Sequence, residues 1–248
     1  MWPDMTRRST ARELMDDRSI GGDELAVALG QLRVINSWLG SGWPTLEGVS
    51  SFWRKAGRPA RLTILDVGAG SGDVNRLLLA WAIRRNIALH ITLVDMHPET
   101  CASAAAYYRD DPRVQVVCSD LLHLGMQPAD IVTATLFTHH FPSEQLAEVL
   151  ATLSHMARIG VVINDLHRHP VAWAGIWVAT RLFSRNRMIR HDAPLSVQRG
   201  FRLSDLDQLR SAPALGILSY VWRPFFRYLI TIPSKTFSIE ANMASDNA

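Results

Sequence analysis

The sequence predicts an α/β fold with a mostly parallel sheet, because strand-like and helix-like segments alternate through its middle. Short apolar runs and segments with helical spacing of apolar residues follow one another from residue 61 to residue 165. This order is typical of parallel strands joined by crossover helices. Five strands are expected there, over 61–67, 89–95, 114–118, 131–136 and 160–164, and a hairpin over 215–222 and 225–232 brings the total to seven.

Helical spacing of apolar residues predicts the helices between these strands. Residues 73–87 and 146–153 each carry an apolar stripe, which we expect to pack on the sheet. An alanine-rich helix is expected over 98–109. Ser204 and Asp207 resemble a capping box and predict one more helix.

The two flanks differ from this core. Residues 1–57 are expected to form an N-terminal helical cap, most clearly over 23–39, where leucines recur on one face. The core domain is expected to span 58–233 and to include a helical lid insertion over 166–200. The polar segment 234–248 is expected to be a flexible tail.

Composition indicates one large domain from a reducing compartment. The chain has 248 residues, of which 48% are apolar and 20% charged. Cys101 and Cys118 are too few for a disulfide framework and match no zinc spacing, so a cytoplasmic location is expected. No sequence run reaches the ~20 apolar residues that a transmembrane helix needs. The net charge of +3 is spread out, which argues against a nucleic-acid partner.

The most informative motif is a glycine-rich turn directly after the first expected strand. Residues 66–73 have the sequence DVGAGSGD. Glycines at alternate positions let the backbone bend sharply and approach a ligand closely, because no Cβ intervenes. The dinucleotide fingerprint G-x-G-x-x-G would need a small residue at position 73, where this chain has Asp73. The turn therefore predicts a small cofactor other than a dinucleotide.

The pattern D-x-G-x-G-x-G resembles the first motif of class I S-adenosylmethionine (SAM) dependent methyltransferases, which implies a Rossmann-like sheet and SAM as cofactor. In that family the acid at the strand end, here Asp66, and the glycines border the methionine part of SAM. The resemblance implies that Asp95 binds the ribose hydroxyls, with Met96 against the adenine, and that Asp120 accepts from the adenine amino group. The full set implied at the cofactor is Asp66, Gly68, Ala69, Gly70, Gly72, Asp95, Met96, Asp120, Leu121 and Leu136.

A histidine pair follows the fourth expected strand, where the acceptor lies in this family. A histidine here resembles the general base of plant-type phenolic O-methyltransferases, and by that alignment His140 is the match. His139 and Asp165 are the other candidate catalytic residues. Imidazole titrates near neutral pH and can accept a phenol's proton. No metal is expected, because His167 and His169 lack a completing carboxylate or cysteine at a recognisable spacing.

The lid insertion suggests a class of acceptor. Trp173 and Trp177 lie in an apolar stretch, and Trp38, Trp43 and Trp53 would approach from the cap. Such walls would suit a flat apolar acceptor, such as an aromatic polyketide, an alkylated phenol or a quinone precursor. Two alternatives stay open: the stretch fills the lid's own core, or it makes a peripheral contact with a membrane.

Phrases in the flanks extend the resemblance to bacterial small-molecule methyltransferases of the ubiquinone/menaquinone-biosynthesis-like group, including those that tailor aromatic polyketides. They are RELMDD at 12–17 and NDLHR at 164–168. The resemblance implies methyl transfer from SAM to an oxygen of an aromatic or quinone-like natural product, with S-adenosylhomocysteine (SAH) as the other product. Three alternatives remain: C-methylation of a quinone precursor, a NAD(P)-binding oxidoreductase, and a non-catalytic SAM-binding partner protein. The sequence does not indicate the oligomeric state.

Overall fold

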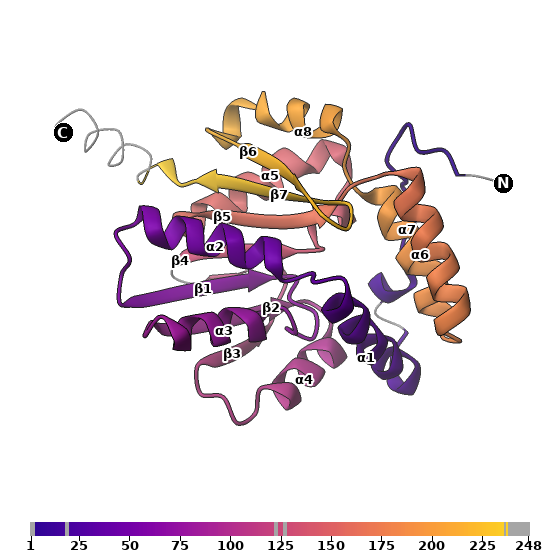
Figure 1. The fold of residues 1–248 in the computed structure, drawn as a ribbon, viewed down its shortest axis with the longest axis horizontal. Helices are drawn as coiled ribbons and strands as arrows, with labels where there is room; N and C mark the ends of the chain where they lie inside the picture. The colour runs from indigo at the N-terminus through magenta and orange to yellow at the C-terminus, as the bar shows by residue number, and fades with distance from the viewer. Residues whose placement is uncertain (1–2, 18–19, 122–123, 126–127, 236, 238–248) are drawn as a thin grey trace.

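A seven-stranded sheet organises the computed structural model, which describes residues 3–17, 20–121, 124–125, 128–235 and 237. The strand order is β3-β2-β1-β4-β5-β7-β6 (Figure 1). β7 pairs antiparallel with β5 and β6, and the other neighbours are parallel. The predicted fold class is therefore confirmed. The strands are β1 Arg61–Val67, β2 Ala88–Asp95, β3 Val114–Cys118, β4 Ala129–Thr135, β5 Ala157–Leu166, β6 Ser219–Arg223 and β7 Arg227–Pro233.

Helices cover both faces of the sheet, which is why the central strands are apolar almost throughout. One face packs against α2 (Trp43–Lys55), α3 (Asn75–Arg84) and α4 (Pro98–Tyr107). The other packs against α5 (Ser143–His155) and α8 (Leu203–Arg210).

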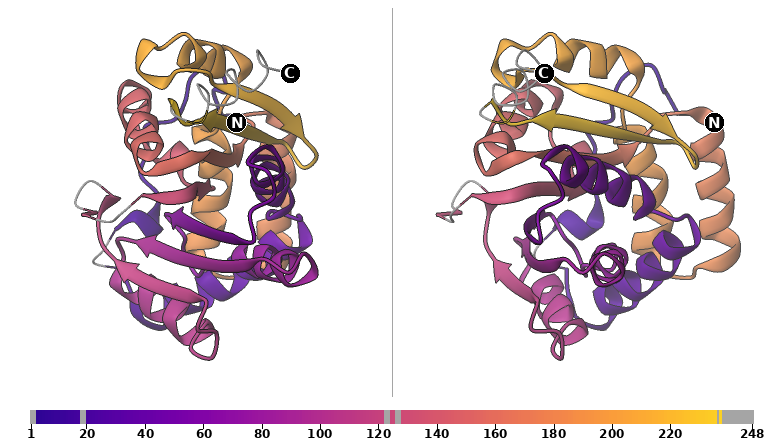
Figure 2. Two further views of the ribbon diagram at one scale, coloured as in Figure 1. Left: turned by 90° about the vertical axis from the view of Figure 1, so that its left-hand side faces the viewer. Right: turned by 60° about the vertical axis from the view of Figure 1, so that its left-hand side comes forward.

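A third group of helices lies beyond the carboxyl ends of the parallel strands (Figures 1 and 2). It contains α1 (Gly22–Trp38), α6 (Pro170–Phe183) and α7 (Arg187–Arg199). Leucines of α1 and the start of α7 form a small core of their own, and α6 packs on α7. These helices, with the short helices η1 (Leu14–Asp16) and η3 (Thr138–His140), enclose the space where ligands bind in open α/β sheets. A further short helix, η4, spans Pro213–Leu215.

The N-terminal cap predicted over 1–57 packs in two different places. α1 lies with α7 at the sheet edge, whereas α2 lies on the sheet itself, where Gly160 leaves room for the Phe52 ring. A Cβ at Gly160 would come within 2.5 Å of that ring. The boundary at residue 57 stays a prediction. The predicted tail falls almost entirely outside the described residues.

The predicted capping box is displaced by two residues from the one in the structure. α8 begins at Leu203, and the Asp205 carboxylate accepts a hydrogen bond of 2.7 Å from the backbone N–H of Arg202. Ser204 and Asp207 therefore do not form the cap. Across the described ranges, no helix combines the length and apolarity needed to cross a bilayer.

Candidate active site

The glycine turn joins β1 to α3 at the carboxyl edge of the sheet. Gly68 and Gly70 have φ values of 62° and 56°, in the left-handed region that favours glycine. A Cβ at Gly68 would fall 2.0 Å from the Phe137 ring, so no side chain fits there. A Cβ at Gly70 would meet no described atom within 4 Å, because the turn faces open space. A ligand can therefore approach the backbone at Gly70.

The turn opens into a cavity of about 510 Å³. Nine of the ten predicted cofactor residues line it: Asp66, Gly68, Ala69, Gly70, Asp95, Met96, Asp120, Leu121 and Leu136. Gly72 is the exception. Its carbonyl accepts from the Tyr108 hydroxyl at 2.6 Å, and a Cβ there would lie 2.6 Å from Leu93. Gly72 thus permits close packing beneath the turn and lies outside the cavity lining.

Asp95 ends β2 and is tied to the glycine turn. Its Oδ2 accepts from the backbone N–H of Gly70 at 3.0 Å, and its Oδ1 accepts from that of His97 at 2.9 Å. Each carboxylate oxygen has a further lone pair for a ligand. The carboxylate is therefore held in one orientation at the cavity surface.

Asp66 lies deeper, at the end of β1, and is 4% exposed. It accepts from Asn75 Nδ2 at 2.6 Å and from Thr133 Oγ1 at 2.7 Å. Burial raises the pKa of Asp66 to about 6, although these two hydrogen bonds favour the charged form. Asp66 therefore ties β1 to α3 and β4 as well as lining the cavity.

The histidine pair lies in η3 and lines the same cavity. His139 is 2% exposed, and its Nδ1 lies 2.6 Å from Asp165 Oδ1. Asp165 Oδ2 also accepts from Thr138 Oγ1 at 2.6 Å and from the His139 backbone N–H at 3.0 Å. Asp165, itself fully buried in β5, therefore fixes both the backbone and the ring of His139.

Opposite charges decide the ionisation of this buried pair. Burial disfavours the imidazolium, but the Asp165 and Glu13 carboxylates overcome it and raise the pKa of His139 to about 9. Burial likewise opposes the Asp165 carboxylate, yet His139 holds the pKa of Asp165 well below its usual range. When the site holds no other cation, His139 is therefore charged at neutral pH.

Two N-terminal carboxylates complete the cluster, and the sequence reasoning assigned neither a role. Glu13 is 6% exposed, and its Oε1 lies 3.6 Å from His139 Nε2. Its Oε2 lies 4.0 Å from His140 Nε2. Asp16 Oδ1 lies 2.9 Å from His140 Nδ1. Both acids belong to the phrase RELMDD, but nothing in the phrase indicates which part of the fold it meets.

Arg199 of α7 holds these segments together and was also missed. It is 7% exposed, and its guanidinium donates to the backbone carbonyls of His139, at 3.2 Å, and of His140. It also donates to the Ala11 carbonyl at 3.0 Å and to Asp16 Oδ2 at 3.3 Å. One buried arginine therefore joins α7, η3 and the N-terminal segment.

The prediction that tryptophans wall the cavity is wrong. Trp53 is buried against Trp81, and Trp38 is 85% exposed. No described residue of α6, including Trp173 and Trp177, lines the cavity. The walls come instead from α1, α7 and the stretch around η3, through Leu25, Leu29, Leu32, Ile189, Phe137 and Phe141.

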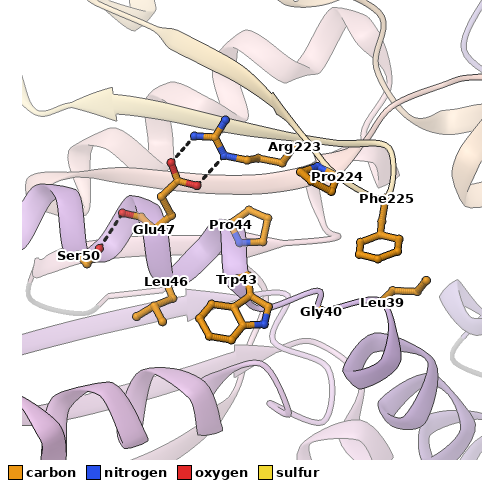
Figure 3. Close-up of a pocket in the computed structure, with 10 residues that line it drawn as sticks. All are labelled: Leu39, Gly40, Trp43, Pro44, Leu46, Glu47, Ser50, Arg223, Pro224 and Phe225. Carbon is orange, nitrogen blue, oxygen red and sulfur yellow. Dashed lines mark hydrogen bonds and ion pairs between the residues drawn. The ribbon is translucent and has the colours of Figure 1, made fainter.

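Trp43 lines a separate groove between the start of α2 and the β6–β7 turn (Figure 3). This groove has a volume of about 460 Å³ and is mainly apolar, with Pro44 and Phe225 among its lining residues. Its charged residues, Glu47 and Arg223, are bonded to each other (Figure 3). The cavity at the glycine turn, with its cluster of acids and histidines, is therefore the candidate active site.

Comparison with known proteins agrees with this assignment. Residues 64–160 match the family model described as a methyltransferase domain. This segment contains the glycine turn, Asp95, Asp120 and the histidine pair. No curated protein matches the sequence.

Solved methyltransferases share the fold at low sequence identity. The plantazolicin methyltransferase BpumL, solved with a triazolic desmethylPZN analog and SAH, is 13% identical with a TM-score of 0.65, covering 86% of this chain and 92% of that one. Magnesium protoporphyrin IX methyltransferase (ChlM) from Synechocystis PCC 6803, solved with SAH, is 14% identical with a TM-score of 0.55, covering 81% and 87%. Residues 64–160 are therefore similar to a methyltransferase domain, and the chain has the Rossmann-like methyltransferase fold.

Proposed function

We propose that the protein is a cytoplasmic enzyme that transfers a methyl group from SAM to a hydroxyl oxygen of an aromatic or quinone-like natural product. One observation carries the proposal: the glycine turn opens into the same cavity as the histidine cluster, by which we mean His139 and His140 with Glu13 and Asp16. SAM, when bound, supplies a methyl carbon on a sulfonium, so that a carbon–oxygen bond forms as the carbon–sulfur bond breaks and SAH leaves.

The cofactor side of the cavity fits SAM. The open backbone at Gly70 lets a ligand approach closely, and the oriented Asp95 carboxylate suits a vicinal diol. Met96 and Leu121 offer apolar surface to an adenine, and Asp120 offers a carboxylate to its amino group. We assign the roles at the cofactor to these residues together with Gly68. The likeness to methyltransferases solved with SAH supports this choice.

The acceptor side fits a hydroxyl on a flat apolar molecule. A phenol has a pKa of about 10, so an oxygen nucleophile at neutral pH needs help in losing its proton. We assign that task to His140, beside which the charged His139, oriented by Asp165, stabilises the phenolate as it forms. The apolar walls from α1 and η3 exclude water and favour an aromatic acceptor.

Incubation of the purified protein with isotopically labelled SAM and a panel of phenols and quinols tests this function. We expect SAH and a methyl ether, identified by mass spectrometry. A product methylated on carbon would replace the O-methylation proposal with C-methylation. Bound SAM without product from any acceptor would favour a non-catalytic binding protein, and bound NAD would favour an oxidoreductase.

A further inference from the structure

Glu13, His139 and His140 present three potential metal ligands toward one another at the cavity wall. His139 Nε2 lies 3.6 Å from Glu13 Oε1, and His140 Nε2 lies 4.0 Å from Glu13 Oε2. A ligand atom from each residue lies within 4.8 Å of the other two. Ligands of a tetrahedral zinc ion, each about 2.0–2.1 Å from the metal, are about 3.3 Å apart. A small contraction would bring these three to bonding distance.

The orientation of the rings is that of a metal site. Metal-binding histidines ordinarily use one ring nitrogen for the ion and the other for a carboxylate, carbonyl or water. His139 Nδ1 is taken by Asp165 at 2.6 Å, and His140 Nδ1 lies 2.9 Å from Asp16. Glu13 has an outer partner too, because Ser196 Oγ donates to its Oε1 at 2.8 Å. Asp165 and Ser196 thus form hydrogen bonds to His139 and Glu13, and Asp16 makes an ion-pair contact with His140, so each of the three groups has a polar partner from a separate element.

A buried nitrogen without a partner points to a missing ligand. Among the described residues, His139 Nε2 is enclosed and has no hydrogen-bond partner, although its side chain is 2% exposed. Buried polar atoms in proteins are nearly always bonded, so an exception calls for an ion or a water. This nitrogen faces the Glu13 carboxylate at the wall of the cavity.

We propose that Glu13, His139 and His140 bind a divalent first-row transition-metal ion, with Asp165, Asp16 and Ser196 as outer partners. Two histidines and one carboxylate leave coordination positions open, as in catalytic zinc and iron sites. Glu13, His139 and His140 line the cavity, so an acceptor hydroxyl could coordinate the ion there; with the ion bound, the proton would go to solvent and His140 would act as a ligand instead of a base. This catalytic use of the ion rests on the proposed function, whereas binding of the ion does not.

Metal binding is measured on the full-length protein after treatment with a chelator and removal of that chelator. Calorimetric titration with Zn²⁺ should give one ion per chain, and Co²⁺ should give visible absorption bands of a low-coordinate site. Glu13→Gln should weaken Zn²⁺ binding by about 100-fold or more, since even outer partners contribute 10–100-fold. Asp16→Asn should weaken it by about 10-fold.

The chain offers a matched control. His167 and His169 are a second close pair, with ring centroids 5.2 Å apart, and they lie outside the cluster. The double variant His167→Ala/His169→Ala should bind Zn²⁺ as the wild type does. Because Glu13 is buried and its replacement can disturb folding, His140→Ala, at a site with a 26% exposed side chain, serves as the second ligand variant.

The proposal is overturned if no stoichiometric ion binds, or if affinity falls in the control variant and not in Glu13→Gln or His140→Ala. Its failure is distinguishable from that of the proposed function. If chelator-treated protein binds no ion and still transfers methyl groups at the wild-type rate, the metal proposal is refuted and the proposed methyltransferase function stands. If an ion binds at these ligands and no acceptor is methylated, the metal site is supported and the O-methylation proposal is refuted.

Discussion

The two sides of the cavity are built in different ways. The cofactor side comes from consecutive strand ends, where backbone and carboxylates from residues 66 to 121 meet at one sheet edge. The acceptor side comes from distant segments: Glu13 and Asp16 near the N-terminus, the histidine pair, Asp165 in β5 and Arg199 in α7. The first side depends on the sheet, and the second depends on contacts that hold the N-terminal segment in place.

Removing Asp95 should break the cofactor side alone and give the largest effect. Asp95→Ala loses the carboxylate that fixes the Gly70 backbone and faces the cavity. Hydrogen bonds to a charged group contribute about 1.5–3 kcal/mol each, so the Kd for SAM should rise by about 100-fold or more. Calorimetric titration with SAM measures this. Asp16→Asn, on the acceptor side, should bind SAM as the wild type does; equal losses in both variants would refute the separation.

Removing Arg199 should break the acceptor side alone. Arg199→Met removes the arginine donor from the His140 and Ala11 carbonyls and from Asp16 Oδ2, and leaves the His139 carbonyl with Arg8 as its donor. The free energy of unfolding should fall by roughly 3 kcal/mol, and turnover should fall with it, because a buried network loses its centre. Denaturant unfolding and SAM titration together test this, with SAM affinity expected to stay near the wild-type value.

Arg187 provides the matched control on the same helix. It makes an ion pair with Glu24 at 2.7 Å, but its side chain is 66% exposed. Exposed pairs contribute about 0–1 kcal/mol, so Arg187→Met should change the stability little. If Arg187→Met destabilised the protein as strongly as Arg199→Met, the special role of the buried guanidinium would be untenable.

The cofactor side should carry its own pH dependence through Asp66. Its folded pKa, about 6, lies above the ordinary value of 3.8, so the folded state holds this proton more tightly than the unfolded chain. The stabilisation is complete below pH 3.8 and is lost as the pH rises through 6. Between pH 4 and pH 7 the wild type should lose roughly 2–3 kcal/mol more stability than Asp66→Asn. Denaturant unfolding at both pH values checks this; parallel pH profiles would show that Asp66 ionises normally.

The smallest effect is expected on α6, whose end carries exposed apolar side chains. Leu182 and Phe183 of α6 are 71% and 85% exposed, whereas Leu29 of α1 is 6% exposed and lines the cavity. Leu182→Gln should leave stability within about 0.5 kcal/mol and the KM for the acceptor unchanged. Leu29→Gln should raise that KM. A higher KM for the acceptor in Leu182→Gln would contradict this assignment and indicate that α6 does contact the acceptor.

Most of the sheet and of the cofactor side could be predicted from the sequence because their determinants are local. A buried apolar run ending in a glycine turn predicts both a strand and the place where its ligand lies. Strands β1 and β3 were predicted with the bounds that the structure has. Gly72 was predicted to border the cofactor but does not line the cavity, for a reason that local sequence does not contain: the residue that limits its size, Leu93, lies in another strand, β2.

The acceptor side could not be predicted because its contacts cross long stretches of chain. Nothing around Glu13 or Arg199 indicates that they meet beside the histidines, more than 120 and about 60 residues away in sequence. The prediction that tryptophans line the cavity was wrong for a related reason. An apolar pattern in a helix does not indicate which part of the fold the helix packs against, and α6 packs on α7 and does not line the cavity. The predicted importance of the histidine pair rested on its place after a strand, which is local.

The central claim is that the histidine cluster acts on the acceptor within the cavity that holds SAM. The most direct measurement compares methyl transfer to a phenol acceptor by His140→Ala and by the wild type, with SAM affinity measured in parallel. Because groups that handle a proton in the transition state typically contribute 10²–10⁴-fold, turnover should fall by about 100-fold or more while SAM affinity stays unchanged. Unchanged turnover, or loss of SAM binding to the same extent as turnover, would contradict the account.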